Sequence, residues 1–249
     1  MRRSGQAAAI LDRLSTQHPG ADTELVFHSP FELLIATILS AQTTDQRVNQ
    51  VMPALVARFP DARSLAAAPI AEVERIIQPT GFFRQKSRTI TAAAAEIVER
   101  FGAEVPGAMD SLVQIPGVGR KTANVVLGHA FRVPGFAVDR HVLRVANRLG
   151  IATSVDPEEV ERQITSVLPP QQWTVASDTL ILHGRRVCKP RPLCEGCEAA
   201  DLCAFRISAR SVSASRRRTG LTPVKRASTA AASPRKRKAP GRSSRSRSR

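Results

Sequence analysis

A glycine turn followed by a helix-like stretch, in residues 115–141, most constrains how this chain can fold. The segment reads IPGVGRKTANVVLGHAFRVPGFAVDRH and places a glycine on either side of Val118. Glycine can adopt positive φ and lets another molecule approach the backbone closely. The N–H groups at the start of a helix after such a turn are free to bind phosphate. We therefore expect a helical hairpin over about residues 110–131, with phosphate contacts from Gly117, Val118, Gly119 and Arg120.

Lys121 and Asp139 are the chemically capable side chains of this segment. Lys121 falls in the first turn of the predicted helix, where a neutral amine could attack an electrophilic sugar carbon and form a Schiff base. Asp139 follows an apolar Gly/Pro loop and can also act as the N-cap of the next helix. The two roles are compatible, because capping holds a carboxylate ionised and fixed. We interpret His141 as an ordinary half-buried histidine.

The composition favours an all-α fold. The 249 residues are 42% hydrophobic but only 4% aromatic, so the core must be aliphatic and rich in alanine, which suits helices. No β-type alternation persists along the chain. The run Ser29-Pro30-Phe31-Glu32 has the pattern of a helix start with a capping box. The apolar stretch that follows it is expected to lie in the centre of the core.

Most of the charge lies at one end of the chain. The net charge is +16, but residues 206–249 contain 15 basic residues and no acidic one, which leaves +1 for residues 1–205. We expect a nearly neutral globule with a disordered basic tail, which binds DNA non-specifically or serves as a nuclear-import signal. No uncharged apolar run reaches the ~20 residues that span a bilayer, and Asp12 interrupts any signal-peptide pattern.

All four cysteines fall within a short segment with the spacing C-x5-C-x2-C-x5-C: Cys188, Cys194, Cys197 and Cys203. Such clustering indicates metal ligation in a reducing compartment more than a disulfide framework. Four thiolates can hold either a [4Fe-4S] cluster or a tetrahedral zinc ion, and the spacing alone does not decide between them.

The glycine turn, Lys121, the Gly/Pro loop and Asp139, in this order, resemble the helix-hairpin-helix DNA glycosylases of the endonuclease III type. The resemblance covers about residues 25–203, and the four cysteines at its end make it specific, whereas the turn alone would also fit a non-catalytic DNA-binding hairpin. It implies a bifunctional DNA glycosylase and abasic-site lyase, which removes oxidised pyrimidines from duplex DNA in base excision repair. It further implies a monomer that is cytoplasmic and DNA-associated, with a nuclear location left open.

The resemblance also implies a two-domain arrangement with the active site in the cleft between the domains. Residues 25–135 would form a helical domain that carries the hairpin and Lys121. Residues 1–24 would join residues 136–205 in a second domain, which carries Asp139 and the loop at residues 188–203. The basic tail, residues 206–249, would follow.

Individual roles follow from the resemblance as well. The cysteines would hold a [4Fe-4S] cluster, Lys121 would attack the C1′ carbon, and β-elimination would nick the strand. A damaged base would be flipped out of the duplex, with Gln42 and Phe82 filling the gap. The alternatives are a helix-end cap for Gln42 and a core position for Phe82. We interpret Lys86 and Arg88 as solvated helix charges.

The sequence departs from the family pattern at two places. Arg140 stands where the family usually has threonine; it would favour the ionised form of Asp139 and could touch a phosphate. Five residues, where the family usually has six, separate the first two cysteines, so that loop must be tighter. Lys189 and Arg191 on this loop are either phosphate contacts or solvated charges.

Three other functions are compatible with parts of the sequence. The adenine-specific relative generally lacks the lysine and carries a further folded domain. A non-catalytic helix-hairpin-helix protein would need neither Lys121 nor Asp139 to bind phosphate. A zinc-stabilised structural protein would differ in its metal content.

Overall fold

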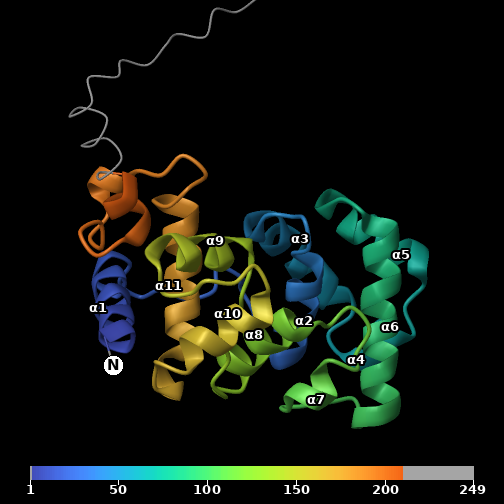
Figure 1. Ribbon diagram of the computed structural model, residues 1–249. Helices are drawn as coiled ribbons and strands as arrows, with labels where there is room; N and C mark the ends of the chain where they lie inside the picture. The colour runs from blue at the N-terminus through green and yellow to red at the C-terminus, as the bar shows by residue number, and fades with distance from the viewer. Residues whose placement is uncertain (1, 210–249) are drawn as a thin grey trace, which may run out of the picture. The chain divides into compact units, whose positions relative to one another are not determined.

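The described chain is built entirely from helices. The computed structural model describes residues 2–209 and contains no β-strand in that range (Figure 1). The α-helices are α1 (Arg2–Gln17), α2 (Pro30–Leu39), α3 (Asp45–Arg58), α4 (Ala62–Ala66), α5 (Ile70–Ile77), α6 (Phe83–Phe101), α7 (Met109–Leu112), α8 (Arg120–Ala130), α9 (Arg140–Leu149), α10 (Pro157–Thr165) and α11 (Trp173–Arg186). Three short 3-10 helices, η1 (Gln78–Thr80), η2 (Pro170–Gln172) and η3 (Cys194–Gly196), complete the order. The predicted all-α class is thus confirmed.

Two further predictions concern the basic tail and membrane-spanning segments. The disordered basic tail falls almost wholly on residues 210–249, which lie outside the described residues. Within residues 2–209, no helix combines the length and the apolar character needed to cross a bilayer.

The buried apolar side chains form two separate clusters. The first cluster runs from Leu25 to Leu127 and joins α2, α3, α6 and α8. The second cluster combines Ile10, Leu11 and Leu14 of α1 with residues between positions 136 and 203. In Figure 1, α1 accordingly lies beside α11, far from the helices that follow it in sequence. This pairing of the N-terminal helix with the last third of the chain accords with the expected arrangement, while the domain boundaries themselves stay a prediction.

The helix α2 is the centre of the first cluster. All seven residues from Leu33 to Leu39 are buried. Ser29 Oγ accepts a hydrogen bond from the Glu32 N–H at 3.1 Å, as predicted for the N-cap. Glu32 Oε2 accepts from the His28 N–H at 2.8 Å rather than from Ser29, so the reciprocal half of the predicted capping box is wrong. The carboxylate instead satisfies the donor one residue further from the helix.

The hairpin has a shorter first helix than expected. α7 ends at Leu112, and the Ile115 N–H returns to the Leu112 carbonyl at 3.1 Å in a turn. A residue that precedes proline disfavours the α conformation, so Pro116 prevents the helix from reaching Ile115. The turn then passes Gly117, whose φ is 80°, and enters α8 at Gly119.

Glycine occupies the two positions of the turn for different physical reasons. A Cβ at Gly117 would collide with Thr89 Cγ2 and would also require left-handed backbone. At Gly119 the backbone is extended, and no protein atom lies within 4 Å of the position a Cβ would take. Gly117 is therefore required by the fold, whereas the space at Gly119 is open to another molecule.

Gly117→Ala should destabilise the protein by about 2 kcal/mol or more, because left-handed strain adds to overpacking against Thr89. Gly119→Ala is the matched control, and it should cost about 1 kcal/mol or less, as for a weaker N-cap residue. Urea unfolding of both variants checks the difference. Equal stability losses would contradict the assignment of strain to Gly117.

Candidate active site and metal centre

One pocket of the described chain contains both predicted catalytic residues. α8 contributes Lys121, Val125 and His129, which recur every four residues and therefore share one helix face. Asp139, just before α9, lines the same pocket. The other lining residues come from the linker after α1 and from α2, α3 and α11: Asp22, Thr23, Glu24, Leu25, Thr37, Ser40, Asp45, Asp178, Ile181, Leu182 and Arg185. The pocket thus joins elements of both apolar clusters.

Asp139 is held as the N-cap of α9. Its Oδ1 accepts the backbone N–H groups of His141 at 2.7 Å and Val142 at 2.8 Å. Both bonds use the same oxygen, which leaves Oδ2 available for chemistry. The predicted capping role is therefore confirmed and does not compete with a catalytic one. His141 is half-buried, as predicted.

The loop that ends at Asp139 is tied to the helix that carries Lys121. Asn124 Nδ2 donates to the Phe136 carbonyl at 3.1 Å, and Ser177 Oγ of α11 donates to the Ala137 carbonyl at 2.7 Å. A Cβ at Gly135 would lie 2.5 Å from the Asn124 carbonyl oxygen, so only glycine permits this approach. These contacts set the position of Asp139 relative to α8.

Most residues predicted to bind phosphate lie at the start of α8, and they differ in how available they are to a phosphate. The Val118 side chain is 5% exposed and its N–H bonds the Ile115 carbonyl, so Val118 anchors the turn from inside. Arg120 forms a two-pronged ion pair with Glu161 of α10, at 2.9 and 2.8 Å. Arg120 must therefore exchange this carboxylate for any phosphate. Arg140 is exposed at the first position of α9.

The pocket contains charged residues that the sequence did not reveal. Arg185 Nη1 forms ion pairs with Asp45 Oδ2 at 2.7 Å and with Glu24. These residues lie on α11, α3 and the N-terminal linker, and no local spacing connects them. Their ion pairs join the linker and both clusters at the rim of the pocket.

His129 lies between two carboxylates. Its Nδ1 is 3.0 Å from Asp22 Oδ1, and its Nε2 is 3.4 Å from Asp178 Oδ2. Burial alone would lower the pKa of His129, but the two carboxylates raise it above its ordinary value. For the Asp178 carboxyl, by contrast, burial itself raises the pKa. A protonated His129 directs one ring N–H toward each carboxylate and so connects α8, α11 and the linker. The recurrence of Lys121, Val125 and His129 at every fourth residue was the sequence signal for this side of the pocket.

Gln42 and Phe82 stand at the tips of two loops. Gln42 is exposed with a φ of 54°, and the helix ends beside it are capped by Ser40 and Thr44, so the helix-cap interpretation of Gln42 is wrong. Phe82 is 67% exposed with a φ of 48°, so its core interpretation is wrong too. The neighbouring Phe83 packs partly buried against the first cluster.

Lys86 is not the solvated charge that we predicted, whereas Arg88 is exposed as expected. Lys86 is 5% exposed, and its Nζ donates to Thr43 Oγ1 at 2.7 Å and to the Thr80 carbonyl at 3.0 Å. The sequence did contain a signal for this burial. Lys86 falls on the apolar stripe of α6 that continues with Ile90, Ala93 and Ile97.

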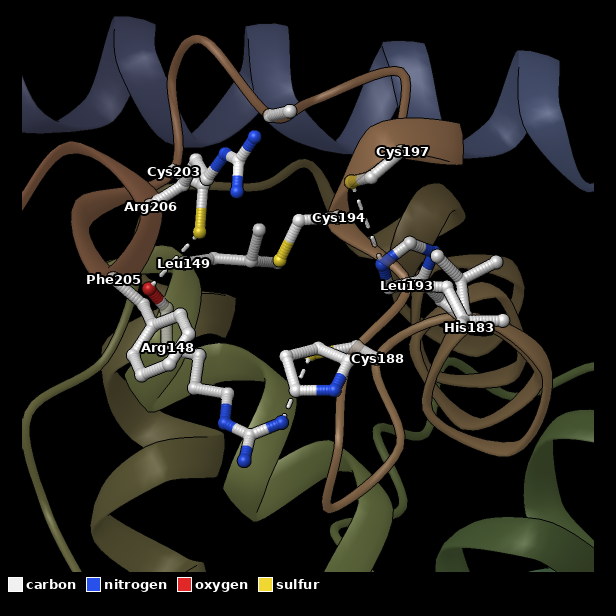
Figure 2. A pocket seen from close by; sticks show the side chains of 13 residues that line it. Arg148, Leu149, His183, Cys188, Leu193, Cys194, Cys197, Cys203, Phe205 and Arg206 are labelled. Atoms are coloured by element: carbon white, nitrogen blue, oxygen red, sulfur yellow. Dashed lines mark hydrogen bonds between the residues drawn. The ribbon is translucent and has the colours of Figure 1, made fainter. Parts of the chain in front are cut away.

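The four cysteines, all of them free thiols, line a second pocket and surround its centre (Figure 2). Arg148 closes the shortened first loop: its guanidinium donates to the Lys189 carbonyl at 2.6 Å and to the Pro190 carbonyl at 3.0 Å. The same side chain reaches Cys188 Sγ at 3.5 Å, and His183 Nε2 lies 3.7 Å from Cys197 Sγ. Lys189 and Arg191 are exposed.

No three of the four cysteine sulfurs all lie within 4.8 Å of one another. Within residues 2–209, ligand atoms of three or more His, Cys, Asp or Glu side chains gather within 4.8 Å only at Asp22, His129 and Asp178. A tetrahedral zinc ion with Zn–S bonds of about 2.3 Å holds its sulfurs about 3.8 Å apart. Burial, reinforced by the neighbouring cysteines, raises the pKa of the Cys197 and Cys203 thiols, so a cationic centre is needed to favour their thiolates.

Comparison with known proteins assigns the chain to a family. Residues 35–170 match the HhH-GPD superfamily of base excision DNA repair proteins, and the chain belongs to this superfamily. Within it, the chain is endonuclease III-like. It is 48% identical over 200 residues to the endonuclease III of Synechocystis sp., covering 80% of this chain and 91% of that protein. It is 42% identical over 201 residues to the Escherichia coli K12 endonuclease III, covering 79% and 94%.

Solved structures agree with this assignment. A trapped covalent intermediate of an endonuclease III with DNA, which contains an estranged adenine, superposes with a TM-score of 0.79 at 39% identity, over 83% of this chain and 98% of that chain. A thermostable thymine-DNA glycosylase, at 21% identity and a TM-score of 0.74, shares the fold over 82% of this chain and 98% of its own.

The raised pKa of His129 predicts a pH-dependent stability. A histidine whose pKa is raised by folding contributes fully below its ordinary value of about 6.5, and the contribution is lost as the pH rises through the raised value. The raised pKa of Asp178 acts in the same direction. His129→Gln should therefore lower the melting temperature most at acidic pH, and the difference from the parent protein should shrink as the pH rises above neutrality.

Thermal unfolding across this pH range measures the effect. His28→Gln, at an exposed histidine, is the matched control and should show no such trend. A stability difference for His129→Gln that is constant with pH would contradict the raised pKa of His129.

Proposed function

We propose that Lys121 and Asp139 carry the chemistry of this chain, which is a DNA glycosylase and abasic-site lyase of base excision repair. The observation that supports the assignment most is that both side chains line one pocket, from opposite apolar clusters. A structurally similar endonuclease III has been trapped in a covalent intermediate with DNA. A pocket that contains both a lysine amine and a fixed carboxylate exceeds what phosphate binding alone requires.

The partner is double-stranded DNA that contains a damaged pyrimidine or an abasic site, bound by the protein as a monomer. The start of α8 faces the phosphate backbone with its free N–H groups, and open space at Gly119 allows close approach. Arg120, Arg140, Lys189 and Arg191 add positive charge along this route. An enzyme of this kind is DNA-associated in the cell, and we place it in the cytoplasm.

The damaged base leaves the duplex before any bond is broken. It rotates into the pocket, and Gln42 and Phe82 enter the vacated stack from their loop tips. Both side chains are suited to this because they are exposed and carried on left-handed backbone that projects them away from the helices. The oxidised pyrimidine is then enclosed by polar groups that include Asp45 and Asp178.

The reaction needs one proton acceptor and one nucleophile. Asp139 accepts a proton from the Lys121 ammonium group, and the neutral amine attacks C1′. The C1′–N bond breaks, its electron pair leaves with the base, and the base takes up a proton. Loss of a further amine proton, with opening of the sugar ring, gives the Schiff base. Removal of a C2′ proton then expels the 3′ phosphate by β-elimination and cuts the strand.

The cysteines Cys188, Cys194, Cys197 and Cys203 would hold a [4Fe-4S] cluster. A set of four thiols suits either such a cluster or zinc, and the similarity of the chain to endonuclease III favours the cluster. When bound, the cluster supplies a rigid link between the loop and the helices around it. Arg148 donates an N–H to Cys188 Sγ and would offset part of the negative charge of the thiolates, while His183 Nε2 lies beside Cys197 Sγ.

Lys121→Ala should abolish the Schiff base. Borohydride reduction on DNA with an abasic site should cross-link the parent protein and give no cross-link with the variant, because the amine that forms the imine is gone. Asp139→Asn keeps an oxygen for the two cap hydrogen bonds but loses the charge, so base excision should slow by about a hundredfold or more.

Gel-based trapping and single-turnover excision measure these effects, and both variants should bind abasic DNA as tightly as the parent. A full yield of cross-link with Lys121→Ala would move the nucleophile to another residue. Unchanged excision with Asp139→Asn would reduce Asp139 to a helix cap.

The metal centre is tested by composition. Protein purified without oxygen should be yellow-brown and contain about four iron atoms and four sulfides per chain. Cys197→Ser should lose most of the visible absorbance, because one of the four thiolate ligands is removed. One zinc ion per chain in place of iron would refute the cluster.

A further inference from the structure

Lys86 is a buried cation without a carboxylate partner among the described residues. It lies on the core side of α6, and burial lowers the pKa of its ammonium group. A buried lysine costs free energy that an apolar residue at the same place would not. Its stem packs on the apolar stripe of α6, so methionine would fit the same space. The polar head must therefore be explained by what it contacts.

The head group joins two loops that are distant in sequence. Its Nζ donates to Thr43 Oγ1, in the loop between α2 and α3, and to the Thr80 carbonyl, in the loop before α6. Thr43 Oγ1 in turn donates to the Thr80 carbonyl at 2.5 Å. The three groups form a closed triangle of hydrogen bonds, and the triangle fixes one loop against the other.

Each loop has its exposed tip directly beside this triangle. Gln42 precedes Thr43, and Phe82 follows Thr80 by two residues. The tips share a second property: Gln42, Gly81 and Phe82 all have φ between 48° and 68°. Left-handed backbone at a residue other than glycine is strained and persists only where the surroundings hold it. The triangle is a contact that joins the two strained tips to each other.

We propose that Lys86 is a positioning residue, which fixes the two loops so that Gln42 and Phe82 enter the DNA stack together. The inference rests on the insertion role proposed above for these two side chains. Lysine suits the task because one ammonium group has three donors and can bond both loops at once. An apolar residue would remove both hydrogen bonds of the ammonium group and leave one side of the triangle, the bond between Thr43 and Thr80.

Lys86→Met should separate extrusion of the base from the later chemistry. It keeps the length and packing of the stem, and it leaves no buried acceptor unpaired, because Thr43 Oγ1 still donates to the Thr80 carbonyl. Single-turnover excision of an oxidised pyrimidine should slow by about tenfold to a hundredfold, as expected when reacting groups are misplaced by about 1 Å. Borohydride trapping on DNA with a preformed abasic site should stay within about twofold of the parent, because no base has to be extruded there.

A fluorescent base beside the lesion reports the insertion step directly. 2-Aminopurine brightens when it loses its stacking, so the parent protein should raise its emission on binding and Lys86→Met should raise it much less. Arg88→Met is the matched control: it removes an exposed cation from the same helix and should behave like the parent in all three assays. Thr43→Val, which breaks the triangle from the other side, should reproduce the selective loss of excision.

The outcomes separate the positioning role from the proposed function. A parent protein that neither excises nor traps would overturn the function itself. A functional parent with Lys86→Met equal to Arg88→Met in excision and fluorescence would overturn the positioning role alone. Equal losses of excision and trapping in Lys86→Met would also overturn it, because they would indicate general damage to the fold. If Lys86→Met does not fold, Thr43→Val decides: unchanged excision and fluorescence in that variant overturn the proposal.

Discussion

The burial of α2 on all sides is the constraint on which the rest of the structure depends. Seven consecutive buried residues cannot be covered by one neighbour, so α3, α6 and α8 must all pack around the helix. The polar groups at its C-terminal end, Thr37 and Ser40, then face the pocket rather than solvent. Because α8 packs against α2, the position of Lys121 is set by apolar packing far from the reacting atoms.

The second apolar cluster positions the carboxylate of Asp139 in a comparable way. α9 and α11 approach so closely that a Cβ at Gly184 would lie 2.8 Å from His141 Cβ. This contact brings Arg185 of α11 beside the acidic residues of the linker and α3, whose charges it offsets. The ion pairs at Arg185 offset the negative charge of these carboxylates, which would otherwise repel a polyanion.

Much of the site could be predicted from short-range sequence patterns, whereas the rest depends on contacts that those patterns do not contain. Asp139 as a cap and the turn at Gly117 each follow from a few adjacent residues, and both are found. Two predictions were wrong: Glu32 was expected to bond the Ser29 N–H, and Lys86 was expected to be solvated. Glu32 bonds the His28 N–H, one residue before the predicted cap, whereas the partners of Lys86 lie on two loops that are distant in sequence.

Charged residues were the main source of error for a physical reason. A lysine is usually solvated, so composition assigns it to the surface unless periodicity is given more weight than polarity. Lys86 shows that the apolar stripe of α6 was the better guide. His129 lies on the face of α8 that also holds Lys121, but its partners Asp22 and Asp178 come from the linker and α11. No pattern within α8 could have named them.

The attachment of α1 to the cysteine loop has a consequence for how the chain is made. Gln6, Arg13 and Gln17 bond the segment at residues 196–202, across about 180 to 200 positions of sequence. The first cluster is contiguous and can pack while the ribosome is still adding residues. α1 emerges first but finds its partners last. Ile10 and Leu14 have their apolar partners at residues 136 and beyond, so α1 cannot complete its packing until that part of the chain has been made.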